Sequence, residues 1–180
     1  MFPFLKNKPF LRREAFFKKA VFLTFALFLS AGLLFISCSD NEVEGADSIP
    51  VGNWASPYDG YKITKSTLEQ WSAESVYNGV TYPATSTKGS ISEAVAFSSS
   101  AGVLIVKVTS DTSSNSVPTG KFIGIYYKDV TASHASLATA YDTSTWTLIV
   151  KDTLADAKAI FTVDKVGTHV SMWGAYDKGQ

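Results

Sequence analysis

Residues 91–108 read ISEAVAFSSSAGVLIVKV, and this stretch indicates a protein built on β-strands. Polar and apolar residues alternate over Ile91–Phe97, which is typical of a half-buried strand. Val103–Val108 is a continuous β-branched run of the kind found in a central strand. The Ser-rich segment Ser98–Gly102 would turn the chain between the two strands. The residues expected to share one face of the first strand are Ile91, Glu93, Val95 and Phe97.

Similar patterns recur on both sides of this pair. Asn78-Gly79 is a dipeptide typical of a two-residue hairpin turn, and Thr109–Gly120 has the polar composition of a loop. Many short strands separated by regularly spaced turns indicate a sandwich or a barrel. The other predicted strands are Asn53–Pro57, Tyr61–Leu68, Ser75–Tyr77, Val80–Tyr82, Lys121–Val130, Ser136–Tyr141, Thr145–Lys151 and Thr168–Tyr176.

One segment near the C-terminus has a helical pattern instead. Thr153 and Asp156 form a capping motif before good helix formers, so a short helix is predicted at Leu154–Phe161. We therefore predict a mainly β protein, an antiparallel up-and-down barrel of about eight strands with one short helix before the last strand. Closure of such a barrel requires its first and last strands to pair, which would bring Trp54 and Trp173 together, both buried.

The first 37 residues have the pattern of a secretory signal. Six Lys or Arg residues and one acid precede an apolar run at Ala20–Ile36, and the only cysteine of the chain, Cys38, follows. Phe35-Ile36-Ser37-Cys38 resembles a bacterial lipobox, in which the cysteine is lipidated and becomes the first residue of the mature chain. An uncleaved membrane anchor is the alternative, because 17 apolar residues lie at the lower limit for a spanning helix.

We accordingly expect three parts, a signal peptide at 1–37, a lipidated Cys38 with an acidic tether at 38–50, and a barrel domain at 51–180. The expected location is the cell envelope, with the lipid on Cys38 holding the protein to a bacterial membrane. The part after the signal has 10 Lys, 15 acids and no Arg. This charge balance argues against nucleic-acid binding, in which Arg supplies the bidentate contacts.

Four motifs spread over residues 50–178 point to a known family. Together they resemble the lipocalin-like lipoproteins of treponemes. The resemblance implies a calycin-type barrel and a lipid anchor, and it implies no catalytic activity. The motifs are Gly52-Asn53-Trp54, Asp59-Gly60-Tyr61-Lys62-Ile63-Thr64, Thr153-Leu154 with Ala157-Lys158 and Phe161-Thr162, and Trp173-Gly174 with Tyr176 and Lys178.

No catalytic, metal or cofactor site is predicted from the sequence. His134 follows Ser133 in a loop, but no partner carboxylate is marked for this pair, and His169 is expected on the solvent face of a strand. Neither histidine belongs to a Cys/His or Asp/Glu cluster at the spacing of metal ligands. The numerous aromatic residues instead allow either a filled barrel or an apolar cavity for one ligand. The residues expected to line such an interior are Trp54, Tyr61, Tyr126 and Trp173.

Two functions therefore stay open for a protein that we do not expect to be an enzyme. The first is the binding of a small hydrophobic ligand inside the barrel. The second is a structural or interaction role on the cell surface or in the periplasm, with a filled barrel and a protein partner.

Overall fold

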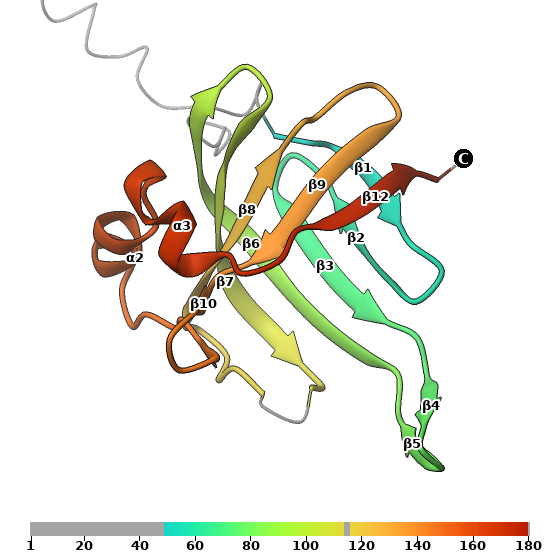
Figure 1. Cartoon of the computed structure of the whole chain (residues 1–180). Coiled ribbons are helices and arrows are strands. Elements are labelled where there is room, and N and C mark those ends of the chain that lie inside the picture. The colour runs from blue at the N-terminus through green and yellow to red at the C-terminus, as the bar shows by residue number, and fades with distance from the viewer. Residues whose placement is uncertain (1–48, 114–115, 180) are drawn as a thin grey trace, which may run out of the picture. The chain divides into compact units, whose positions relative to one another are not determined.

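In residues 49–113 and 116–179, which the computed structural model describes, the fold is a closed antiparallel β-barrel of eight strands (Figure 1). Neighbours around the barrel follow the chain order, so the predicted up-and-down barrel is confirmed. The predicted signal peptide, Cys38 and the tether as far as Ser48 lie outside the described residues. The barrel strands are β1 (Gly52–Ala55), β2 (Asp59–Ile63), β3 (Thr67–Ser72), β6 (Thr85–Ser98), β7 (Ala101–Asp111), β8 (Phe122–Lys128), β9 (His134–Thr139) and β12 (Gly174–Lys178).

Two small ribbons and three short helical segments complete this part of the chain. The ribbon β4–β5 continues β3 and β6 beyond the barrel wall (Figure 1). We call this end of the barrel, where β3, β7 and β9 finish, the mouth. No helix within residues 49–113 and 116–179 is long and apolar enough to cross a membrane. The remaining elements are β4 (Ser75–Tyr77), β5 (Val80–Tyr82), β10 (Tyr141–Asp142), β11 (Thr147–Leu148), α2 (Leu154–Ile160), the 3-10 helix η2 (Val163–Lys165) and α3 (Val166–His169).

The first and last strands close the barrel, as predicted. β1 pairs with β12 through Trp54 opposite Lys178 and Ala55 opposite Asp177. Trp54 is buried, but Trp173 precedes β12 and is only half-buried. The expectation that both indoles are buried together is therefore wrong for Trp173, which lies on the outer side of the barrel.

Several predicted strand limits are wrong for local reasons. The predicted strand Tyr61–Leu68 is two strands, because the Thr64 hydroxyl accepts hydrogen bonds from the backbone N–H groups of Ser66 (3.2 Å) and Thr67 (2.9 Å) and forms a turn. The first part of the predicted strand Thr168–Tyr176 contributes to α3, and β12 begins only at Gly174. The alternating pattern of the sequence therefore failed in both segments. A side-chain hydrogen bond forms a turn in the first, and a helix occupies the start of the second.

The pair β6–β7 is the longest in the barrel and is curved by irregular pairing. The register shifts between Lys88 and Gly89 and again between Ile91 and Glu93. A β-bulge changes which face a side chain occupies, so Ile91 lies inside the barrel whereas Val95 packs outside it. The predicted common face of Ile91, Glu93, Val95 and Phe97 is therefore wrong. Gly89 fits the first bulge because a Cβ there would lie 2.4 Å from a Val106 methyl.

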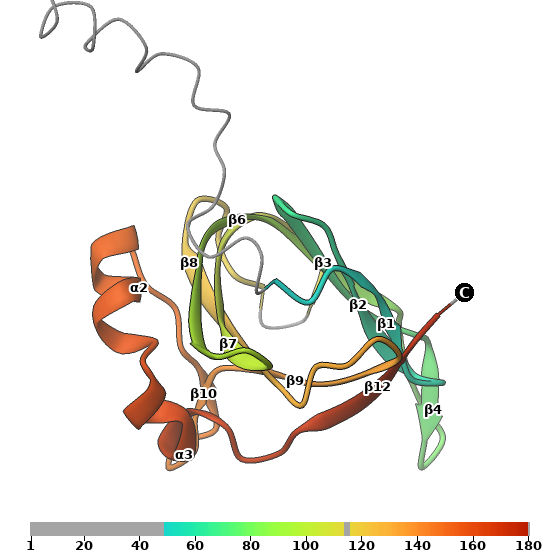
Figure 2. The same ribbon diagram turned by 90° about the horizontal axis from the view of Figure 1, so that it is seen from above.

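Two apolar cores result, one inside the barrel and one between the barrel wall and the helices. Period-two alternation in β7 and β8 supplies both cores from the same strands. Figure 2 shows α2 and α3 together on one side of the barrel. The interior includes Trp54, Tyr61, Leu68, Leu104, Ile125, Tyr127 and Tyr176, and the outer core includes Val103, Ile105, Tyr126, Ala157 and Phe161.

The helix α2 forms as its sequence predicts and docks through one aromatic residue. The Thr153 hydroxyl accepts a hydrogen bond from the Asp156 N–H at 3.1 Å, which caps the first turn. Phe161, just after the helix, is buried against β8 at Gly124. A Cβ on Gly124 would lie 2.6 Å from the Phe161 ring, so only glycine permits this close approach.

The position of His169 also differs from its prediction. His169 ends α3 and is buried, not exposed on a strand, because the chain is still helical there. Its Nδ1 lies 3.1 Å from the Tyr126 hydroxyl, under the helical layer. Burial lowers the pKa of His169, and the Lys165 charge lowers it further, against smaller opposite effects of Asp142 and Asp164.

This buried imidazole predicts a loss of stability in mild acid. The pKa of His169 is lower in the folded than in the unfolded chain, where it is about 6.5. As the pH falls, His169 is therefore protonated in the unfolded chain before it is protonated in the folded chain. The stability that the neutral imidazole contributes is present above pH ~6.5 and is lost at lower pH. The slope cannot exceed ~1.4 kcal/mol per pH unit for one proton. Urea unfolding at pH 7.5 and 5.5 should show a smaller pH effect in His169→Gln than in wild type.

The matched control is His134→Gln, which removes the second histidine from the surface, where it lies 3.3 Å from Asp177. An equal pH effect in wild type and His169→Gln would contradict the prediction.

Candidate functional site

The four aromatic residues predicted to line the barrel do not come together. Trp54 and Tyr61 lie in the interior, whereas Tyr126 and Trp173 belong to the outer layer under the helices. The alternation in β8 was correctly predicted, but the face that contains Tyr127 points inward and the face that contains Tyr126 points outward. The Lys128 ammonium lies over the Trp173 ring, 4.7 Å from the ring centroid.

Large side chains fill the deep interior of the barrel. The Trp54 indole donates a hydrogen bond to the Pro50 carbonyl at 2.6 Å, and both residues are buried. The Tyr61 and Tyr176 rings meet edge to face, with their centroids 5.3 Å apart. Burial raises the pKa of Tyr61 to about 12, and it also raises the pKa of Tyr176. Both phenols therefore stay neutral at physiological pH.

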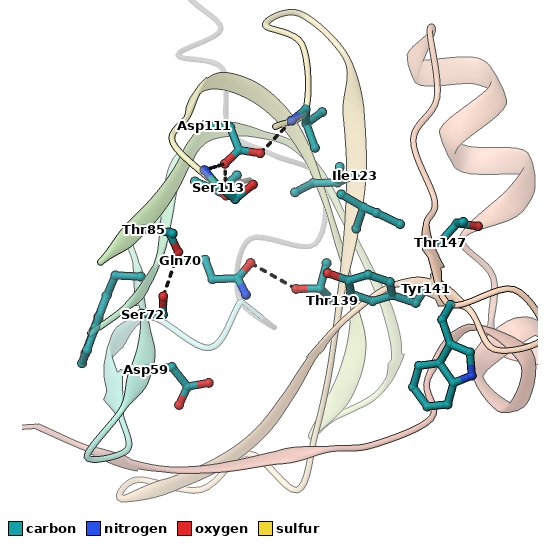
Figure 3. Close-up of a pocket in the computed structure, with 15 residues that line it drawn as sticks. Asp59, Gln70, Ser72, Thr85, Asp111, Ser113, Ile123, Thr139, Tyr141 and Thr147 are labelled. Carbon is teal, nitrogen blue, oxygen red and sulfur yellow. Dashed lines mark hydrogen bonds between the residues drawn. The ribbon is translucent and has the colours of Figure 1, made fainter. Parts of the chain in front are cut away.

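Above this filled region, a cavity of about 530 Å³ opens at the mouth (Figure 3). Its size falls within the usual range for small-molecule sites, ~300–1,000 Å³. Its walls come from β2, β3, β6, β7, β8 and β9 and from the β10–β11 ribbon, whereas the described strands β1 and β12 contribute no residue to the lining. The lining residues are Asp59, Gln70, Trp71, Ser72, Thr85, Thr87, Asp111, Ser113, Val117, Ile123, Thr139, Tyr141, Trp146, Thr147 and Leu148.

The register of β2, β3, β6 and β7 explains why one wall of this cavity is polar. Residues directly opposite each other in antiparallel strands point to the same face. Successive rows across these strands change from polar at the mouth to apolar further in. The outer row is Asp59, Ser72 and Thr85; the second is Tyr61, Gln70, Thr87 and Asp111; the third is Ile63, Leu68, Gly89 and Val108.

The opposite wall is more apolar. Ile123 and Leu148 contribute aliphatic surface there, and Val117 adds an apolar side chain beside Asp111. Figure 3 shows Tyr141 directed inward from the side opposite Asp59 and Gln70, with Thr147 on that same side. The cavity therefore has one hydrogen-bonding wall and one apolar and aromatic wall.

A short chain of hydrogen bonds orients Gln70 in the polar wall. The Tyr61 hydroxyl lies 3.3 Å from the Thr139 hydroxyl, which donates to Gln70 Oε1 at 3.1 Å. Because the amide oxygen is held by Thr139, the Gln70 NH₂ group is directed away from it and has no hydrogen-bond partner among the described residues (Figure 3). This group is a donor available to a ligand.

Two carboxylates complete the polar wall. Asp59 accepts hydrogen bonds from the Ser56 hydroxyl and from the Tyr176 hydroxyl, the latter at 2.9 Å. Asp111 accepts from the Thr87 hydroxyl at 2.9 Å and from the N–H groups of Ser113 (2.8 Å) and Val117 (2.7 Å). Burial opposes ionisation of Asp111, but these hydrogen bonds outweigh it and lower its pKa.

The chemistry available in the cavity is hydrogen bonding and electrostatic attraction. Among the described residues that line it, none is His, Lys, Arg or Cys, and its carboxylates accept hydrogen bonds from hydroxyl groups such as that of Thr87. The described residues also contain no group of three or more His, Cys, Asp or Glu side chains that could hold a metal ion.

Sequence reasoning missed the polar lining, although a signal was present. The predicted strand began at Ile91, whereas β6 begins at Thr85. Extending the alternation backwards from Ile91 places Gly89, Thr87 and Thr85 on the inner face. The partners Gln70 and Asp111 require the register of strands far apart in the chain, which no local pattern provides.

Comparison with known proteins gives no match, whether to a family model, to a curated protein or to a solved structure.

Proposed function

We propose that this protein is a lipid-anchored protein of the bacterial cell envelope that binds a small molecule in the mouth of its barrel. The cavity of about 530 Å³, with a hydrogen-bonding wall facing an apolar one, is the observation that supports binding. Its described lining contains no His, Lys, Arg or Cys, and we propose binding without catalysis.

The anchor and the family assignment are supported by the sequence. A basic segment, an apolar run and Cys38 follow one another as in lipoprotein precursors, and the motifs of the barrel resemble those of lipocalin-like lipoproteins of treponemes. An acidic tether after Cys38 would keep the barrel in solution near the membrane surface.

The anchor proposal predicts the behaviour of Cys38→Ser. This variant, expressed in a bacterial host with lipoprotein processing, should accumulate as the unprocessed precursor and take up no radiolabelled fatty acid. The reason is that the thiol of Cys38 is the acceptor of the lipid, and the chain has no other cysteine. Ser37→Ala keeps the thiol and should still be labelled. Label incorporated into Cys38→Ser would exclude this lipidation site.

The residues that line the cavity indicate which class of ligand it could bind. A small hydrophobic ligand deep inside the barrel was the expectation from sequence, and large side chains occupy that space in the structure. A ligand in the mouth would bury an apolar part against Val117, Ile123 and Leu148 and present hydrogen-bonding groups to Gln70 and Asp59. We therefore propose an amphipathic ligand.

Blocking the mouth tests the binding proposal. Thr85 points inward in the outer polar row, so Thr85→Trp should fill part of the cavity. Native mass spectrometry of the protein from its own host should show a bound small molecule in wild type and lose it in Thr85→Trp. Ser86→Trp, one residue further on the outer face, is the control and should keep the molecule. Equal occupancy in all three proteins, or no bound molecule, would contradict binding at the mouth.

One observation favours the second function, an interaction role. The β4–β5 ribbon exposes apolar side chains on a projection of the barrel, with Val76 and Tyr77 each 68% exposed and Tyr82 50%. Exposed apolar groups of this kind commonly contact a partner. Absence of any ligand from the mouth would leave this function as the better supported one.

A further inference from the structure

The mouth cavity carries negative charge without a compensating positive charge. Asp59 and Asp111 both line it, and neither makes an ion pair with a described residue. Their hydrogen bonds come from hydroxyl and backbone N–H groups, which stabilise a carboxylate without cancelling its charge. A cavity with one sign of charge and low-dielectric walls concentrates oppositely charged molecules.

The negative field extends across the cavity. Tyr141 enters from the wall opposite Asp111 (Figure 3). Burial raises the pKa of Tyr141, and the negative charge of Asp111 raises it further. A positive group between these walls would therefore be attracted from the side of Asp111 and would meet a neutral phenol at Tyr141.

Trp146, which lines the cavity, combines high exposure with an unusual backbone conformation. Its side chain is 70% exposed and yet lines the cavity. Its backbone has φ = 56°, in the left-handed region that bulky residues rarely adopt and glycine adopts readily. Asp142 fixes this turn, since its backbone carbonyl accepts from the Trp146 N–H at 2.7 Å. Folding alone would favour glycine here, and an exposed indole at such a position motivates a functional hypothesis.

We infer that the mouth binds a small organic cation, an ammonium compound with a short apolar body, between the carboxylates of the polar wall and the indole of Trp146. This inference rests on the proposed binding function. The ammonium group would lie near Asp111, which β3 and β6 separate from Asp59, and its methyl or methylene groups would contact Val117, Leu148 and the Trp146 ring. Trp is the most effective aromatic partner of a cation. A fatty acid or phosphate ester would be repelled by the same carboxylates.

Probes of equal shape and different charge test the inference. The full chain, held in nanodiscs of zwitterionic lipid, is titrated by calorimetry with choline, 3,3-dimethyl-1-butanol and 3,3-dimethylbutyrate. The alcohol has the shape of choline without its charge, and the butyrate carries the opposite charge. Choline should bind at least about tenfold more tightly than the alcohol, and the butyrate should not bind. A series of longer alkyltrimethylammonium ions, each with its neutral analogue, covers ligands with a larger apolar body.

Trp146→Gly separates binding from folding. Glycine suits the left-handed turn, so the urea midpoint should stay the same or rise, while the affinity for the best cation should fall about tenfold. Met172→Ala, which removes another highly exposed apolar side chain, is the control and should leave the affinity unchanged. An unchanged affinity in Trp146→Gly would exclude the role of the indole.

The outcomes distinguish this inference from the proposed function. If neutral analogues bind as tightly as the cations and Thr85→Trp blocks both, the cation assignment is wrong and binding at the mouth stands. If no cation, alcohol or carboxylate binds and no molecule copurifies, both proposals are wrong.

Discussion

Trp54→Ala should lower the free energy of unfolding by about 3–5 kcal/mol, the usual cost of emptying a large buried aromatic site. Trp54 is 1% exposed and lies on β1, where the barrel closes against β12. The substitution would leave a cavity beside the closure and free the Pro50 carbonyl, which the indole N–H contacts at 2.6 Å. Because domains of this size have only ~5–15 kcal/mol of stability, urea unfolding should show a much lower midpoint.

The control for this prediction is Trp146→Phe, which alters an exposed tryptophan at the mouth. Substitutions on exposed positions usually change stability by less than ~0.5 kcal/mol. A Trp54→Ala protein with the urea midpoint of wild type would contradict the assignment of Trp54 to the barrel core.

Phe161→Ala should have an effect of similar size, about 3–5 kcal/mol, in the other core. Phe161 is 1% exposed, packs on Gly124, and meets the rings of Tyr126 and His169 edge to face, at 6.5 Å and 6.2 Å. Its loss removes a buried aromatic contact between the helical layer and β8. Urea unfolding monitored by circular dichroism measures the loss, since both cores belong to one unit of the chain.

Val163→Ala is the matched control, because Val163 lies two residues away and is 62% exposed. We expect it to change the free energy of unfolding by less than ~0.5 kcal/mol. A Phe161→Ala protein as stable as this control would show that the helical layer does not contribute to the stability of the barrel.

Features with a local cause were predictable from sequence. The Asn78-Gly79 turn forms as expected, with φ of 49° and 77°, because these two residues tolerate the left-handed conformation of a two-residue hairpin. Thr153 caps α2 through its own hydroxyl, three residues from its partner. Closure by the first and last strands followed from the need to leave no unpaired strand at the sheet edge.

Features that depend on distant parts of the chain were not predictable in the same way. The alternation in β8 was visible, but it could not show that Tyr127 faces inward and Tyr126 outward, since the barrel interior buries one face and the helical layer buries the other. The mouth was missed because Asp59, Gln70 and Asp111 become neighbours only through three strand pairings. Trp173 and His169 were misplaced because a short helix, α3, occupies the segment assigned to the last strand.

The closure of the barrel also has a mechanical consequence. Only two pairs of residues join β1 to β12, whereas six join β3 to β6. Ile49, just before β1, is buried in the core. A force applied through the N-terminal segment would therefore load the shortest strand pairing of the barrel first, and amide hydrogens of β1 should exchange with solvent sooner than those of β7.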